Sequence, residues 1–187
     1  MPPTPASAAE KTLHWLVAAA VTGLVATGAV MYVPALSQAV GQRFWVRAGH
    51  LAAAGAVALM PGVIAAVRWP EVRELERSLS CWEQVDVAWF AQPWRVFGSR
   101  GVVEVGEGGR FNGGQKLFAA LITSALVILL VTGVPMYWWD RFSAELVARA
   151  RELHVVLALA LVALLAGHVY LGLLSPYGLL ERHLRRR

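Results

Sequence analysis

Long apolar segments separated by shorter polar ones dominate the hydrophobic pattern of this chain. A helix needs about 20 apolar residues to cross a bilayer, and four segments are long enough. They cover residues 13–33, 44–67, 117–139 and 153–174. Because backbone amides that face lipid must be hydrogen-bonded within their own segment, we expect all four to be helical. The pattern therefore predicts an all-α integral membrane protein built as a four-helix bundle.

Two local signals refine the first two spans. Pro61 lies inside the second span and predicts a kink close to this residue. Lys11 precedes the first span, as in a signal peptide, but the apolar run is too long for that and no clean cleavage site follows it. Ser7 and Glu10 have the spacing of a capping box, which favours a retained membrane helix.

The composition agrees with a membrane protein. Of the 187 residues, 57% are hydrophobic, and the mean hydropathy is +0.53. This is too apolar for an ordinary soluble domain, and we expect a single membrane domain over residues 1–187. The lone cysteine, Cys81, excludes an internal disulfide, a cysteine-based zinc site and a CxxCH haem attachment.

The positive charges predict how the chain is oriented in the membrane. With the N-terminus inside, the inner segments hold twelve Lys and Arg residues and the outer loops hold five. The inner set comprises Lys11, Arg68, Arg73, Arg77, Arg95, Arg100, Arg110, Lys116, Arg182, Arg185, Arg186 and Arg187, and the outer set comprises Arg43, Arg47, Arg141, Arg149 and Arg151. We therefore expect both termini to be cytoplasmic, in a bacterial inner membrane. Topology and contact with the lipid bilayer explain the net charge of +5 without a nucleic-acid partner.

The inner loop, residues 68–116, is the longest polar region. Within it, a predicted helix that starts near Pro70 carries an apolar side formed by Val72, Leu75, Leu79, Trp82 and Trp89. Such a helix would lie along the inner membrane surface, and contact with another cytoplasmic protein is the alternative. The outer loops are expected to have about a dozen residues each, too few for a domain that could oxidise a substrate.

Four histidines lie within the spans at two predicted depths. His14 and His168 fall near the inner face, and His50 and His154 fall near the outer face. The two histidines of the fourth span are fourteen residues apart, which separates them by about 21 Å along a helix and by only about 40° around it. Imidazoles at two levels on one side of a helix predict two stacked cofactors in the core of a bundle.

Haem b is the natural cofactor, because two neutral imidazoles can ligate its iron axially and no thiolate is needed. We therefore predict two b haems, an inner one held by His14 and His168 and an outer one held by His50 and His154. A single intramembrane histidine could instead form a helix–helix hydrogen bond or take part in a proton relay. The pairing of four histidines by depth favours ligation. His183, among the terminal arginines, is expected to be solvated and not a ligand.

An internal repeat supports the outer pair. The sequence TGAVMY at residues 27–32 recurs as TGVPMY at residues 132–137. The sequence RAGH at residues 47–50 recurs as RELH at residues 151–154. The first helical hairpin should therefore resemble the second, with a pseudo-twofold relation in the outer half of the bundle that relates the two outer histidines.

The repeat also brings arginines and glycines next to the outer haem site. Arg47 and Arg151 each precede a histidine by three residues, on the same helix face, and could neutralise a haem propionate. Gly28 and Gly133 could let a porphyrin approach the helix backbone closely. Helix packing is the alternative role for these glycines.

The chain resembles the cytochrome b (gamma) subunit of membrane-bound formate dehydrogenases. These belong to the wider group of four-helix di-haem cytochromes b, which includes hydrogenase cytochromes and bacterial cytochrome b561. The resemblance covers nearly the whole chain, through LHWL at residues 13–16, the two repeats and the fourteen-residue histidine spacing. The more specific motif is RFNGGQKLF at residues 110–118, which is similar to the quinone-site loop of formate dehydrogenase gamma subunits.

This resemblance implies that Asn112 and Gly114 line a quinone pocket beside the inner haem and His168. An amide and exposed backbone N–H groups can hydrogen-bond a quinone carbonyl, whether of menaquinone or ubiquinone. The alternative is a glycine-rich turn in which Asn112 caps a helix and Lys116 snorkels to the lipid boundary.

The function implied by the resemblance is that of a haem-bearing membrane anchor. Electrons would come from a periplasmic iron–sulfur subunit served by a catalytic molybdenum or tungsten subunit, pass from the outer to the inner haem and reduce quinone. A stand-alone cytochrome b561-like oxidoreductase, acting on quinone and a small species such as superoxide, is an alternative. The cytochrome b subunit of a nickel–iron hydrogenase is a second, and a transporter or anchor without redox function is a third.

Overall fold

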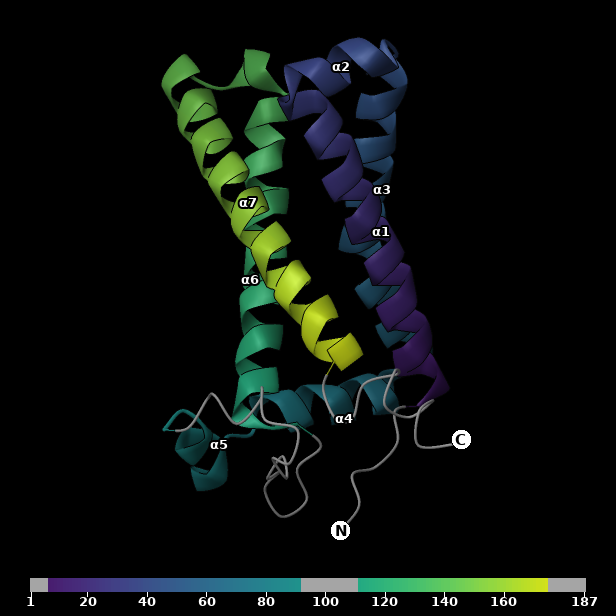
Figure 1. Ribbon diagram of the computed structural model, residues 1–187. Coiled ribbons are helices and arrows are strands. Elements are labelled where there is room, and N and C mark those ends of the chain that lie inside the picture. The colour runs from purple at the N-terminus through teal and green to yellow at the C-terminus, as the bar shows by residue number, and fades with distance from the viewer. Residues whose placement is uncertain (1–6, 92–110, 175–187) are drawn as a thin grey trace, which may run out of the picture. The chain divides into compact units, whose positions relative to one another are not determined.

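The computed structural model describes residues 7–91 and 111–174, most of which are helical (Figure 1). The helices are α1 (Ala8–Tyr32), α2 (Pro34–Val40), α3 (Arg43–Val67), α4 (Trp69–Ser80), α5 (Gln84–Trp89), α6 (Gly113–Tyr137) and α7 (Ala144–Leu174), and a 3₁₀ turn, η2 (Trp139–Arg141), precedes α7. No strand occurs in these two ranges, so the predicted all-α class is confirmed for them. The predictions for Arg95, Arg100, Arg110, Arg182, His183, Arg185, Arg186 and Arg187 lie outside the described residues.

Four of the described helices are long and apolar enough to cross a membrane. The candidate spans are Glu10–Tyr32, Arg43–Val67, Gly113–Tyr137 and Ala144–Gly172. Each corresponds to one of the four spans predicted from the sequence, which identifies a multi-pass membrane protein. The orientation of the termini stays a prediction.

The fourth of these helices is longer than expected. α7 begins at Ala144, nine residues before the predicted start of the span, so Arg149 and Arg151 lie within a helix and not in a loop. The Ser143 hydroxyl accepts a hydrogen bond from the Leu146 amide at 3.3 Å, and Glu145 pairs with Arg149 one turn later at 2.8 Å. Such local contacts extend a helix beyond its apolar part. The connection before α7 therefore spans only residues 138–143, and the prediction of about a dozen residues is wrong for this loop.

The chain divides into two compact units, Pro5–Glu76 and Arg77–Arg187 with Met1–Thr4, each of which contains one helical hairpin. In the first unit, α1 and α3 pack against each other, with α2 in their connection (Figure 1). The predicted capping box at the start of α1 is confirmed, because Ser7 and Glu10 bond each other's backbone amides at 3.2 and 2.7 Å. α3 continues past Pro61 as one helix, and the kink expected there stays a prediction.

In the second unit, α6 and α7 form the other hairpin and are joined by η2 (Figure 1). α6 also contains a proline, Pro135, close to its C-terminal end. His154 and His168 both lie on α7, which is uninterrupted between them. The predicted separation of about 21 Å therefore applies to a single continuous helix.

The inner loop does not form the one long amphipathic helix expected from residue 70 onward. α4 ends at Ser80, and the short α5 begins at Gln84. The break has a local cause, because Glu83 and Asp86 form a capping box that starts a new helix, with the Glu83 amide donating to Asp86 Oδ2 at 2.9 Å. Trp89 therefore belongs to a different helix from Val72, Leu75 and Leu79.

Candidate functional site

One candidate ligand, His50, is held across the α1–α3 hairpin by a threonine. His50 Nδ1, on α3, lies 2.9 Å from Thr27 Oγ1 on α1. The same hydroxyl lies 2.6 Å from the main-chain carbonyl oxygen of Gly23, one turn earlier on α1. A methyl group at Gly28 would lie 3.6 Å from Cε1 of the His50 ring. The Thr–Gly pair of the repeat thus faces the imidazole directly.

The α6–α7 hairpin repeats this arrangement with its own residues. His154 Nδ1 lies 2.9 Å from Thr132 Oγ1, and this hydroxyl lies 2.8 Å from the Ile128 carbonyl oxygen. A methyl group at Gly133 would lie 3.8 Å from His154 Cε1. The predicted likeness of the two hairpins therefore extends to the contacts of their histidines.

In the sequence, Thr27 and Thr132 stand out only as members of the repeat, which by itself predicts no role for them. The signal was present, since a hydroxyl recurs at the position before each glycine and a histidine recurs on the following span. A methyl group added at Gly28 or Gly133 would have the histidine ring as its nearest neighbour, at ordinary van der Waals distance. The approach of a porphyrin to these glycines stays a prediction.

The other two candidate ligands have aromatic neighbours. His168 on α7 stacks on Phe118 of α6, with ring centroids 4.8 Å apart and planes 10° from parallel. The rings of His14 and Trp15 on α1 form a T-shaped pair, with centroids 5.4 Å apart and planes at 75°. Both imidazoles are exposed at the surface of their hairpin, where a cofactor can reach them. The hairpins are separate units, so the pairing of His14 with His168, and of His50 with His154, stays a prediction.

The donor set fits haem better than a bare metal ion. Within residues 7–91 and 111–174, no group of three or more His, Cys, Asp or Glu side chains is placed to hold a metal by itself. Haem needs only axial ligands from the protein, because the porphyrin supplies the other four. Two histidines on each hairpin are consistent with that requirement.

Arg47 and Arg151, the predicted propionate partners, lie one turn before His50 and His154 on α3 and α7. Both are exposed. Their helical positions match the prediction, and their contact with a propionate stays a prediction.

The NGGQK motif forms the start of α6. Asn112 is the N-cap residue, and its side-chain oxygen accepts a hydrogen bond from the Gln115 amide at 2.9 Å. The Gln115 side-chain oxygen accepts in return from the Asn112 amide at 3.0 Å, which completes a capping box. Asn112 is 5% exposed. The interpretation of Asn112 as a helix cap is thus confirmed, and its contact with quinone stays a prediction.

The two glycines of the motif lie where α5 comes closest to α6. A methyl group at Gly113 would collide with the Asp86 carbonyl group, and one at Gly114 would lie 2.5 Å from the Trp89 ring. A side chain at Gly113 would therefore require the α5 backbone to move, and one at Gly114 would require the Trp89 side chain to move, because real Cβ contacts are essentially never this short. Gly114, predicted to line a quinone pocket, therefore also has a packing role.

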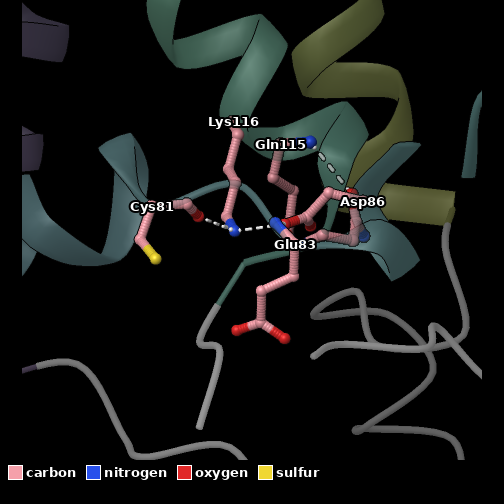
Figure 2. Close-up of polar contacts among 6 residues, drawn as sticks. Cys81, Glu83, Asp86, Gln115 and Lys116 are labelled. Atoms are coloured by element: carbon pink, nitrogen blue, oxygen red, sulfur yellow. Dashed lines mark hydrogen bonds and ion pairs between the residues drawn. The ribbon is translucent and has the colours of Figure 1, made fainter. Parts of the chain in front are cut away.

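Lys116 completes the contact between α5 and α6, as Figure 2 shows. Its Nζ donates to the Asp86 carboxylate and to the Cys81 carbonyl oxygen, both at 2.6 Å. The two side chains are only 3% and 1% exposed. The alternative in which Lys116 snorkels to the lipid boundary is therefore wrong, because a buried carboxylate binds its ammonium group. The second carboxylate oxygen, Asp86 Oδ1, is buried without a hydrogen-bond partner in the described structure.

Comparisons with known proteins identify related sequences. The profile of a family described as prokaryotic cytochrome b561 matches residues 5–186. The chain is also similar to the formate dehydrogenase cytochrome b556(fdo) subunit of Escherichia coli strain K12 and to the subunit of that name in Escherichia coli O157:H7, with 41% identity over 75 residues in each case. The match covers 37% of this chain and 35% of each relative, so it spans about a third of the relatives' length.

Proposed function

Because this chain belongs to the prokaryotic cytochrome b561 family, we propose that it is the di-haem cytochrome b subunit of a formate dehydrogenase in a bacterial inner membrane. It would pass electrons from a periplasmic iron–sulfur subunit to quinone near the cytoplasmic face. The observation that carries this proposal is the contact found in both hairpins, in which a threonine hydroxyl lies 2.9 Å from a histidine Nδ1. The similarity to formate dehydrogenase cytochrome subunits supports the choice of complex.

The four histidines are the proposed ligands. His50 and His154 hold an outer haem, and His14 and His168 hold an inner one. Two b haems, when bound, each take up and release one electron at iron. This pairing rests on the depth of each histidine along its span as predicted from the sequence.

Arginines are proposed to complete the outer haem site. Arg47 and Arg151 lie one turn before the outer histidines on the same helix face and would provide positive charge for two propionates. A guanidinium binds a carboxylate through two parallel hydrogen bonds, so these residues also fix the rotation of the bound group. Their exposure on α3 and α7 leaves them accessible to such a ligand.

Quinone is proposed to bind beside His168 at the N-terminal end of α6. Asn112 and Gly114 lie at that end, and Phe118 lies one turn further along, stacked on His168. The Asn112 side chain uses its oxygen for capping, so its amide NH₂ is the group that can donate to a quinone carbonyl. Protons for the quinol would come from the cytoplasm, and formate oxidation outside would then build a membrane potential.

The short connections within the hairpins are the reason for proposing partner subunits. The connections within the two hairpins, residues 33–42 and 138–143, are too short to hold a substrate-oxidising domain. We propose that an iron–sulfur subunit docks over the outer haem and that a molybdenum or tungsten subunit oxidises the donor. Co-purification of these two metal subunits would separate this function from its main alternative.

That alternative is a stand-alone cytochrome b561-like oxidoreductase that exchanges electrons between quinone and superoxide. The family membership favours it as a second candidate. The NGGQK motif favours the formate dehydrogenase subunit, because it resembles the quinone-site loop of that group. A hydrogenase cytochrome b would share most of the same residues.

Haem analysis tests the proposal. The purified full-length protein should contain two non-covalent b haems per chain by the pyridine haemochrome method, because the four histidines form two pairs. A pigment-free protein, a single haem or covalently attached haem would refute the di-haem assignment.

A further inference from the structure

The two threonine hydroxyls each touch a backbone carbonyl and an imidazole nitrogen at the same time. Thr27 Oγ1 lies 2.6 Å from the Gly23 oxygen and 2.9 Å from His50 Nδ1. Thr132 Oγ1 lies 2.8 Å from the Ile128 oxygen and 2.9 Å from His154 Nδ1. All four distances are within hydrogen-bond range. Each hydroxyl also lies near a second carbonyl oxygen of its own helix, that of Leu24 at 3.3 Å or of Leu129 at 3.2 Å.

The number of available protons fixes the direction of these bonds. A hydroxyl has one proton to donate and two lone pairs that accept. A carbonyl oxygen can only accept, so the threonine proton goes to the carbonyl of the preceding turn. The imidazole nitrogen must then donate its own proton to the hydroxyl oxygen. The opposite tautomer would place the Nδ1 lone pair against an oxygen lone pair at 2.9 Å.

This direction decides which ring nitrogen is left for a metal. A neutral imidazole carries one proton, so in a ring protonated at Nδ1 the unprotonated nitrogen is Nε2. A hydrogen bond at one ring nitrogen generally fixes the tautomer and rotation of a metal-ligating histidine and raises its basicity. We propose that Thr27 and Thr132 are positioning residues that hold His50 and His154 in the orientation that ligates iron through Nε2. This inference rests on the proposed haem-binding function.

The glycine that follows each threonine lies next to the same histidine ring. A methyl group added at Gly28 or Gly133 would lie 3.6 or 3.8 Å from Cε1 of the ring that the preceding threonine contacts, which is ordinary van der Waals distance. In each repeated Thr-Gly pair, the threonine hydroxyl thus contacts the imidazole nitrogen and the glycine lies beside the same ring.

Thr22 provides a matched internal comparison. Its hydroxyl donates to the Ala18 oxygen at 2.8 Å on the same helix as Thr27, in the same one-turn pattern. The bond to the preceding turn is thus ordinary for threonine in a helix. What distinguishes Thr27 and Thr132 is the histidine across the hairpin.

The test uses the full-length protein purified with its haem, and substitutes valine, which keeps the shape of threonine but lacks the hydroxyl. Thr27→Val and Thr132→Val should each weaken binding of one haem about tenfold, at the lower end of the range for such partners. The midpoint potential of that haem should rise, because a less basic ligand stabilises ferric iron less. Thr27→Ser should keep the properties of the parent protein, and Thr22→Val should change neither readout.

Three results would overturn the inference. The first is unchanged haem affinity and midpoint potential in both valine variants. The second is an equal effect of Thr22→Val. The third is a Thr27→Ser variant that behaves like Thr27→Val, because the hydroxyl alone would then not preserve the properties of the haem. The haem content of the parent protein distinguishes failure of this inference from failure of the proposed function. A parent protein with two haems and silent valine variants would refute only the positioning role, whereas a parent protein without haem would refute the proposed function.

Discussion

Asn112 shows how one residue can satisfy two different requirements. Its side-chain oxygen caps α6, and its NH₂ group is the proposed donor to quinone. The two roles use different atoms of the same amide. They can therefore be separated by a substitution that keeps one and removes the other.

Asn112→Ser is that substitution, because serine is as good an N-cap as asparagine but has no amide donor. We expect thermal stability and haem content to stay close to those of the parent protein. Quinone affinity should fall by about two- to tenfold, the worth of one neutral hydrogen bond. The measurement is the rate at which quinone reoxidises the reduced haems, compared over a range of quinone concentrations.

Asn112→Ala is the control, since alanine removes the cap as well as the donor. It should lose stability in addition to quinone affinity. If Asn112→Ser reoxidised at the parent rate at every quinone concentration, Asn112 would be a helix cap and no quinone ligand.

The sequence identified the residues of the histidine sites more readily than those of the α5 contact. The repeat placed a threonine and a glycine on one span and a histidine on the next, which periodicity can detect. Asp86 could not be found in this way. It lies 30 residues from Lys116 in the sequence, and no local pattern links a carboxylate in the inner loop to a lysine at a helix start. A long-range contact of this kind becomes visible only when both segments are folded.

At the scale of elements, the hydrophobic pattern predicted the existence of four spans but not all of their ends. The start of α7 was missed because its first turns are polar and are stabilised by the Glu145–Arg149 pair. The inner loop was predicted as one helix because its apolar positions share one side. The capping box of Glu83 and Asp86 overrides that pattern by starting a second helix.

The packing of α5 on α6 should depend on the buried ion pair. Lys116→Met leaves the Asp86 carboxylate buried without its cation, and loss of one partner of such a pair costs about 3–5 kcal/mol. Thermal unfolding of the purified protein should show a large loss of stability. Arg149→Met, which breaks the exposed pair with Glu145, should change stability by less than about 1 kcal/mol.

A double substitution shows whether charge is the cause. Lys116→Met combined with Asp86→Asn removes both charges, and the introduced amide keeps an oxygen that can accept from the Glu83 backbone N–H. The double variant should recover most of the stability lost by Lys116→Met alone. A double variant less stable than either single variant would contradict this explanation.

At the scale of the whole molecule, the helices form two hairpins with equivalent histidine contacts. One threonine–histidine pair lies within each compact unit, so neither contact depends on the other hairpin. The proposed haems require more, because each needs one histidine from each hairpin. That pairing came from the depth of the residues in the predicted spans and is the central claim of the account.

Single histidine substitutions with optical and redox analysis of the remaining haem test that claim most directly. His50→Ala and His154→Ala should each leave one b haem, with the same spectrum and midpoint potential in both variants, because they remove the same outer haem. His14→Ala and His168→Ala should each leave the other haem, again with one shared set of properties. If His50→Ala and His154→Ala left two different haems, or if either retained both with unchanged spectra, the two histidines would not ligate the same haem and the proposed arrangement would be wrong.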